Sequence, residues 1–84
     1  MLTFKSLPLF YFKEESGVKP NTVRIVEKHD TRYAYLNDCE HPPKKIKIVN
    51  AGNPKLFFIR EITDISYWSD KELWIISFKH KEDD

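Results

Sequence analysis

The chain has 84 residues, of which 40% are hydrophobic and 32% are charged. This length excludes two separate cores and predicts one small domain spanning residues 1–84. Fourteen basic side chains against thirteen acidic ones leave a net charge of +1, which excludes a generally basic, histone-like nucleic-acid binder. The charge is uneven, because residues 17–60 hold nine bases and four acids whereas residues 61–84 hold three bases and seven acids. The central segment is therefore the part most able to attract an anion.

The first predicted element is a short helix over residues 7–16. Ser6 precedes Leu7 and Pro8, so Ser6 is the expected N-cap and the proline falls in the first turn, where it is tolerated. Gly17 supplies a C-terminal stop. A strand through residues 9–12 is the alternative, because three bulky residues follow one another there.

Five strands are predicted after Pro20. The periodicity changes to two at residues 22–26, and Asp30 then caps a single helical turn unless residues 33–35 form a strand. Residues 45–50 are the clearest strand, with Ile46 and Ile48 inward and the lysines between them outward. A turn at residues 51–54 leads to an antiparallel strand at 55–59, a bend near 61–64, and a hairpin of residues 65–68 and 73–78. The residues from 80 to 84 are expected to form a flexible tail.

The predicted fold is therefore mainly β (α+β): a small, closed or half-closed barrel of about five strands with one short N-terminal helix. A single cysteine, Cys39, excludes an internal disulfide, and no signal peptide or membrane span is recognisable. We expect a cytoplasmic protein without a membrane partner. Cys39 and His41 do not have the spacing of a zinc site, and no phosphate-binding glycine loop is present, so no metal or cofactor is expected.

One octapeptide, residues 17–24, contains the most informative set of side chains. Thr22 and Arg24 are two residues apart on a strand and face the same side, and Lys19 stands at the entry to that strand. Two cations and a hydroxyl beside a helix end can bind a phosphate or the polar edge of a nucleobase. The alternative is structural, with Arg24 paired to a carboxylate such as Glu61 and Lys19 solvated.

The spacing Gly17-x-Lys19-x-x-Thr22-x-Arg24 resembles the signature of ASCH domains, small relatives of the PUA superfamily. The resemblance implies a compact β-barrel with a cleft beside this motif. Most ASCH domains have Glu at the position of Thr22, whereas a subgroup that removes acyl groups from modified cytidine has Thr. The chain also resembles small phage and prophage proteins of Gram-positive bacteria in residues 19–24, in residues 60–65 and at Trp68.

The function expected from these features is binding of RNA or a single nucleotide through a cleft lined by Lys19, Thr22 and Arg24. Arg60 and Trp68 are the expected outer contacts, because stacking aromatic rings interleaved with cations suit unpaired bases. Lys45 and Lys47, on the outward side of a predicted strand, are further candidate contacts to the nucleic acid.

Two other functions are compatible with the sequence. Resemblance to the acylcytidine-hydrolysing subgroup implies Lys19 as base and Thr22 as nucleophile, and Glu61 is the candidate for the assisting carboxylate. A lysine activates a hydroxyl only when its own pKa is lowered, which a neighbouring Arg24 favours. The third possibility is a phage-encoded factor that binds a host protein and modulates it, with no chemistry in a cleft.

Overall fold

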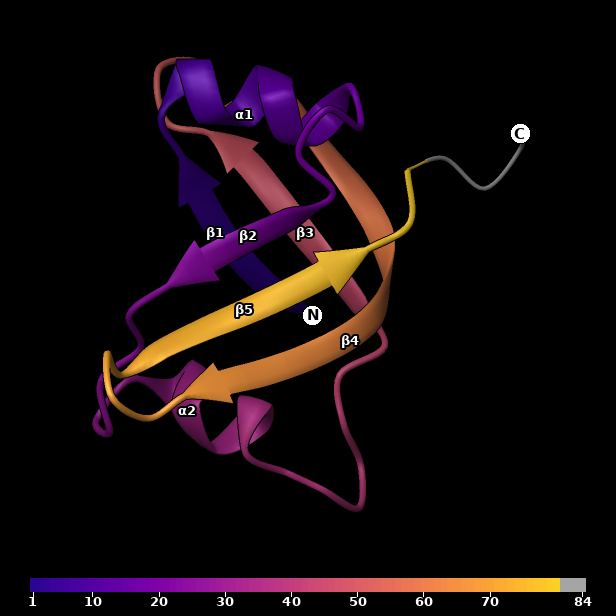
Figure 1. Cartoon of the computed structure of the whole chain (residues 1–84). Helices are drawn as coiled ribbons and strands as arrows, with labels where there is room; N and C mark the ends of the chain where they lie inside the picture. Colours follow the sequence, from indigo (N-terminus) through magenta and orange to yellow (C-terminus); the bar gives the residue numbers. More distant parts are fainter. Residues whose placement is uncertain (81–84) are drawn as a thin grey trace.

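The computed structural model describes residues 1–80, which form five β-strands and two short α-helices. The strands make one sheet in the order β1-β3-β4-β5-β2, in which the β1–β3 pair is parallel and the other pairs are antiparallel. The sheet curls into a half-barrel with α1 across one end (Figure 1), which confirms the predicted mainly β fold. In chain order the elements are β1 (Leu2–Ser6), α1 (Pro8–Glu15), β2 (Asn21–Arg24), α2 (Thr31–Leu36), β3 (Lys45–Asn50), β4 (Phe57–Trp68) and β5 (Leu73–Phe78).

The long strand β4 bends in the middle and so belongs to both halves of the curled sheet (Figure 1). Ile62 lies opposite Phe78 on β5, whereas Asp64 lies opposite Ser77, so Thr63 is an extra, bulged residue. A bulge increases local twist and lets one strand turn a corner of a barrel. The bend predicted near residues 61–64 is confirmed, but the strands predicted at 55–59 and 65–68 are two parts of β4.

The N-terminal residues form a strand that the sequence analysis did not predict. Ser6 ends β1 and does not cap α1; the N-cap is Leu7, which makes no side-chain capping hydrogen bond. The predicted cap is wrong because the Ser6 hydroxyl donates to the carboxylate of Glu14 instead. The helix predicted at residues 7–16 is confirmed as Pro8–Glu15, and the strand considered for 9–12 is wrong.

A second helix, α2, replaces the single turn expected after Asp30. The Asp30 carboxylate accepts a hydrogen bond from the backbone N–H of Arg32, at 2.9 Å, and so provides the predicted N-terminal cap. The turn predicted through Tyr33 and Leu36 is confirmed as this helix, and the strand considered for 33–35 is wrong. The described part of the chain therefore has two helices where one was predicted.

Alternation along the strands builds the core inside the curl. Leu2, Phe4 and Ser6 of β1 are buried while the residues between them are exposed, and β3 and β5 follow the same period of two. The buried apolar side chains form one cluster, made up of Leu2, Phe4, Tyr11, Val26, Leu36, Ile46, Ile48, Phe58, Trp74, Ile76 and Phe78.

The tight turn after α1 requires a glycine. Gly17 has φ of +85°, a conformation that side-chain-bearing residues rarely adopt, and a Cβ there would lie 2.8 Å from Nδ1 of His80. This turn ends the helix where the sequence predicted and directs Lys19 back toward α1. The tail predicted at residues 80–84 lies, from residue 81 onward, outside the described residues.

Candidate functional site

The three motif residues line a single pocket beside α1. Thr22 and Arg24 project from the inner side of β2, and Lys19 precedes the strand. The pocket has a volume of about 390 Å³ and opens between the edge strands β1 and β2. We call it the seam pocket; its lining residues are Lys5, Ser6, Leu7, Phe10, Glu14, Lys19, Thr22, Val23 and Arg24.

A buried carboxylate organises the floor of the seam pocket. Glu14 is 1% exposed, and its Oε1 accepts a hydrogen bond of 2.7 Å from the hydroxyl of Ser6. Lys19 Nζ lies 3.3 Å from Oε2 of the same carboxylate and 3.0 Å from the carbonyl oxygen of Asn21. A buried carboxylate is tolerated when it is paired and hydrogen-bonded in this way. The ammonium group of Lys19 is thereby fixed at the entry to β2.

Arg24 joins the two edge strands across the opening of the half-barrel. Its Nη1 donates to the carbonyl oxygen of Lys5 at 2.6 Å, Nη2 donates to the Ser6 hydroxyl, and Nε donates to Thr22 Oγ1 at 2.9 Å. The guanidinium carbon also lies 5.0 Å from the ring centroid of Phe4. A polar side chain, not a backbone ladder, therefore connects β2 to β1, and we call this line of contact the seam.

Arg32 of α2 makes similar contacts with β1, at a backbone carbonyl two residues before the one that Arg24 contacts. Its Nη1 donates to the carbonyl oxygen of Thr3 at 2.9 Å, and its guanidinium carbon lies 4.4 Å from the centroid of Phe4. The two guanidinium groups therefore share one aromatic ring, and both satisfy carbonyls on the unpaired edge of β1. Cation–π contacts of this kind are worth about 0.5–2 kcal/mol each, depending on solvent exposure.

Burial and neighbouring charges shift the pKa of Arg24. Burial lowers the pKa of Arg24 below its ordinary value, the nearby carboxylate of Glu14 raises it in part, and the like charge of Arg32 lowers it further. A cation with incomplete charge compensation favours an added anion. Within residues 1–80, neither Arg24 nor Lys5 forms an ion pair.

Arg32 is paired with the carboxylate of Asp30, and this pair predicts a lowered pKa for Asp30 that can be measured. The side-chain hydrogen bond from Arg32, followed by the one from its backbone N–H, lowers the pKa of Asp30 from 3.8 to about 2. Because the folded-state pKa is depressed, the stabilisation is present above pH 3.8 and is lost as the pH falls through about 2. We expect an NMR titration of the Asp30 carboxyl to give a midpoint of about 2. In Arg32→Gln the midpoint moves toward 3.8; a wild-type midpoint already at that value would contradict the pairing.

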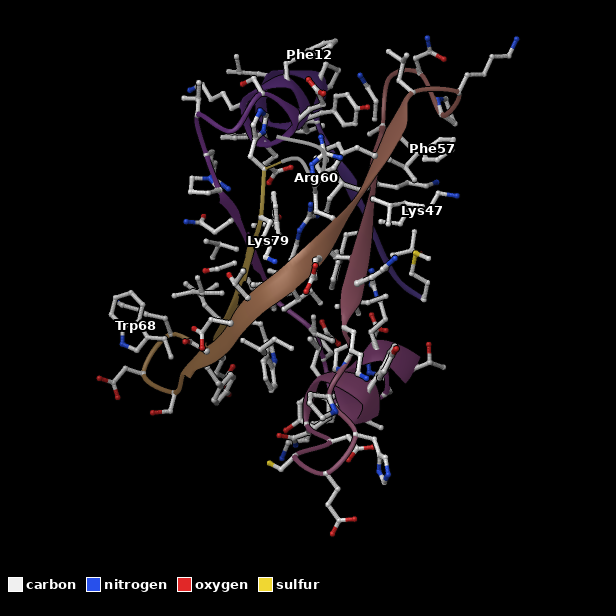
Figure 2. All side chains as sticks on the ribbon, turned by 90° about the vertical axis from the view of Figure 1, so that its right-hand side faces the viewer. Phe12, Lys47, Phe57, Arg60, Trp68 and Lys79 are labelled. Carbon is white, nitrogen blue, oxygen red and sulfur yellow. The ribbon has the colours of Figure 1, made fainter. Side chains whose placement is uncertain are left out.

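The structure places the other candidate contacts away from the seam pocket. Arg60 turns toward the end of α1, with Nη2 3.6 Å from Oε2 of Glu15 and its guanidinium carbon 4.7 Å from the centroid of Phe58. Trp68 is 49% exposed at the end of β4. Figure 2 shows Trp68 at the opposite end of the molecule from Phe12 of α1. Neither Arg60 nor Trp68 lines the pocket.

Lys45 and Lys47 lie on the outer face of the sheet, as their alternation with buried isoleucines predicted. Lys47 Nζ is 4.4 Å from the ring centroid of Phe57 (Figure 2), while Thr22 and Arg24 face inward. The carboxylate of Glu61 on β4 lies 3.5 Å from Nζ of Lys79, the residue that directly follows β5. The proposed pairing of Arg24 with Glu61 is therefore wrong, and the carboxylate beside the motif is Glu14.

Several residues of the seam pocket were not identified from the sequence. Lys5 lies on β1, Phe10 and Glu14 lie on α1, and Leu7 lies between these two elements, which precede the motif. The alternation of Leu2 and Phe4 with polar residues was a signal for β1, and a strand there would have placed the Lys5 side chain on the face opposite these two apolar residues. Nothing local distinguishes Glu14 from Glu15, although only Glu14 is buried.

Comparison of the chain with protein-family models, with curated proteins and with solved structures gives no match. Neither helix in the described part of the chain is long and apolar enough to cross a membrane. Residues 1–80 contain no group of three or more histidine, cysteine or acidic side chains placed to hold a metal ion. The geometry and charge of the seam pocket are therefore the basis for assigning a function.

Proposed function

We propose that the protein binds RNA or a nucleotide, as an ASCH-like module, in the seam pocket lined by Lys19, Thr22 and Arg24. The observation that supports this function most directly is that Lys5 and Arg24, which have no carboxylate partner within residues 1–80, lie on the same pocket as an exposed apolar rim. A phosphate and an aromatic base need these two kinds of surface side by side.

The cationic side of the pocket is suited to a phosphate. A guanidinium has five N–H donors, and the contacts of Arg24 with Thr22, Lys5 and Ser6 use three of them. Two donors remain for an anion. Lys5 adds a charge on a flexible side chain at the rim of the same pocket, since it is exposed on β1.

The other side of the pocket is suited to a base. Leu7 and Phe10 are 63% and 45% exposed, respectively, so an aromatic ring and an aliphatic side chain are open to a ligand. The Phe78 amide donates to the Pro20 carbonyl, and in an antiparallel pair this alternation directs the backbone groups of Val23 away from β5. Val23 also lines the pocket, so its N–H and C=O offer a donor and an acceptor to the edge of a base.

Binding is favoured over hydrolysis of an acylated nucleoside. Thr22 is 1% exposed and its Oγ1 accepts a hydrogen bond from Arg24, whereas the hydrogen bonds of Lys19 go to Glu14 and Asn21. A nucleophile and its base need to lie within hydrogen-bonding reach of each other. The resemblance to ASCH domains supports a cleft beside this motif. In the binding function, Lys19 and Thr22 line that cleft without acting as base and nucleophile.

Phe10 and Phe12 provide a matched pair of variants for testing this function. Both side chains are exposed on α1, but only Phe10 lines the seam pocket. Stacking of one base on an aromatic ring is worth about 1–3 kcal/mol, so Phe10→Ala should weaken binding of a short single-stranded RNA by roughly 5- to 150-fold. Phe12→Ala should leave the affinity within about twofold. Calorimetric titration of both variants at low salt measures the difference.

Two outcomes count against the function. One is the absence of salt-dependent binding of mononucleotides and of short RNA by the wild-type protein, because a phosphate contact is weakened by salt. The other is an equal loss in Phe10→Ala and Phe12→Ala, which would place the ligand elsewhere on α1. Circular dichroism of both variants shows whether each is folded before it is titrated.

A further inference from the structure

A second hollow continues the seam beyond Arg24. It has a volume of about 410 Å³ and shares Lys5 and Arg24 with the seam pocket. We call it the edge hollow, because it follows the unpaired edge of β1. Its lining residues are Thr3, Phe4, Lys5, Arg24, Ile25 and Arg32.

Among the described residues, the edge hollow is lined by three cations and by no acidic side chain. Arg32 is paired with Asp30, whose carboxylate lies 2.6 Å from Nη2, but Lys5 and Arg24 form no ion pair within the described residues. Arg32 uses three of its five N–H donors, on Asp30 and on the Thr3 carbonyl, so two remain. The hollow is therefore a second place along the seam where an anion finds unused donors and uncompensated charge.

We propose that the edge hollow is a second phosphate subsite, so that the ligand is a single strand of at least two nucleotides that crosses Arg24 along the edge of β1. This inference rests on the proposed function, because the seam pocket holds the first nucleotide. Ile25, which is 71% exposed on the wall of the hollow, provides apolar surface for the sugar or base of the second one.

The spacing of the two arginines fits this path. They donate to the carbonyls of Lys5 and Thr3, and backbone positions two residues apart on a strand are separated by about 6.6 Å. Neighbouring phosphates of a stacked strand rise by only about 3.4 Å, but an unstacked single strand can extend the linkage between them to this separation. Neighbouring phosphates of one strand can therefore reach both guanidinium groups at once.

The test compares a nucleoside 5′-monophosphate with the 5′-phosphorylated dinucleotide of the same base, as RNA and as DNA. A charge-assisted phosphate contact in a solvent-accessible groove predicts about tenfold tighter binding of the dinucleotide. The logarithm of its affinity should also fall more steeply with salt, by about 0.7 in slope for one more phosphate. Tighter binding of the dinucleotide supports the subsite whether the sugar is ribose or deoxyribose, because the proposed contacts are to the phosphate.

Ile25→Glu and Leu9→Glu are matched variants for locating the increment. Each puts a carboxylate in place of an exposed apolar side chain, but only Ile25 lines the edge hollow. We expect Ile25→Glu to remove the advantage of the dinucleotide while the monophosphate binds as before, and Leu9→Glu to preserve it. Thr3→Glu, also exposed in the hollow, should repeat the effect if Ile25→Glu does not fold.

The outcomes separate this inference from the function on which it rests. Equal affinities of monophosphate and dinucleotide overturn the subsite and leave nucleotide binding in place. A dinucleotide advantage that survives both Ile25→Glu and Thr3→Glu also overturns it, since the second phosphate then lies elsewhere. Absence of binding by either ligand overturns both proposals.

Discussion

Arg24→Ala should lower the free energy of unfolding by about 3 kcal/mol, one of the two largest effects expected in this protein. The substitution removes the hydrogen bonds to the Lys5 carbonyl, to Ser6 and to Thr22, together with the contact to the Phe4 ring. It leaves the Lys5 carbonyl and the buried hydroxyl groups of Ser6 and Thr22 without their donor. In a domain of this size the melting temperature should fall by roughly 12–24 °C.

Urea denaturation of Arg24→Ala beside Lys47→Ala tests this expectation. Lys47 also contacts an aromatic ring, Phe57, but on the outer face of the sheet, and its removal should change stability by about 0.5 kcal/mol or less. If both variants lose the same small amount, the guanidinium does not hold β1 and β2 together. A large loss in Arg24→Ala also means that weaker nucleotide binding by this variant cannot be assigned to a lost ligand contact, and Phe10 and Ile25 are the better probes.

Glu14→Ala is the second substitution expected to have a large effect, also about 3 kcal/mol. The buried carboxylate accepts from Ser6, is paired with Lys19 and faces the charge of Arg24. Its removal leaves cations in a partly buried site without the opposite charge, and a broken buried pair typically costs about 3–5 kcal/mol. Glu14→Gln keeps an acceptor for Ser6 and should lose less.

Glu15 is the matched control for Glu14, because it is the next residue on α1 and its ion partner is Arg60, at 3.6 Å. The Glu15 side chain is 37% exposed, so solvent screens its pair with Arg60 even though the Arg60 side chain is only 11% exposed, and a screened pair contributes about 1 kcal/mol or less. Thermal and urea unfolding of Glu14→Ala and Glu15→Ala should therefore differ by about 2 kcal/mol or more. Equal losses would show that the buried carboxylate is not the centre of the network.

The parts of the fold that sequence analysis predicted are those with a strong local signal. Ile46 and Ile48 alternate with lysines, so β3 and the side it buries could be predicted, and Gly17 marked the end of α1 because a positive φ was needed there. The misfit of Ile62 with a flat strand located the bulge in β4. Each of these depends on neighbours within a few residues.

The strand β1 was not predicted, because the residues that stabilise it are far away in the sequence. Leu2 pairs with Ile46 and Ser6 with Asn50, and Ser6 before Pro8 has the local appearance of a helix cap. The Ser6 hydroxyl instead donates to Glu14 and accepts from Arg24, two residues that only the tertiary structure brings close to it. A local preference for capping was overridden by long-range hydrogen bonds.

The same distinction applies to the site. Thr22 and Arg24 share a strand and Lys19 directly precedes it, so their convergence followed from spacing alone. Arg60 and Trp68 could be grouped with them only by guessing the topology, and the curl of the sheet separates them from the pocket. The cation and aromatic ring that complete the pocket, Lys5 and Phe10, belong to elements whose position depends on β1.

The order in which the strands pair has a consequence for how the chain folds. β3, β4 and β5 are consecutive and pair through short connections, whereas β1 must wait for β3 and β2 must wait for β5, near the end of the chain. Closing such distant pairs is slow because the chain loses entropy before the contacts form. We therefore expect the central hairpins of β3, β4 and β5 to form first during refolding, and both edge strands to join them later. Arg24 can bridge β1 and β2 only after both strands have paired, so we expect the seam pocket to be completed in the last step of folding.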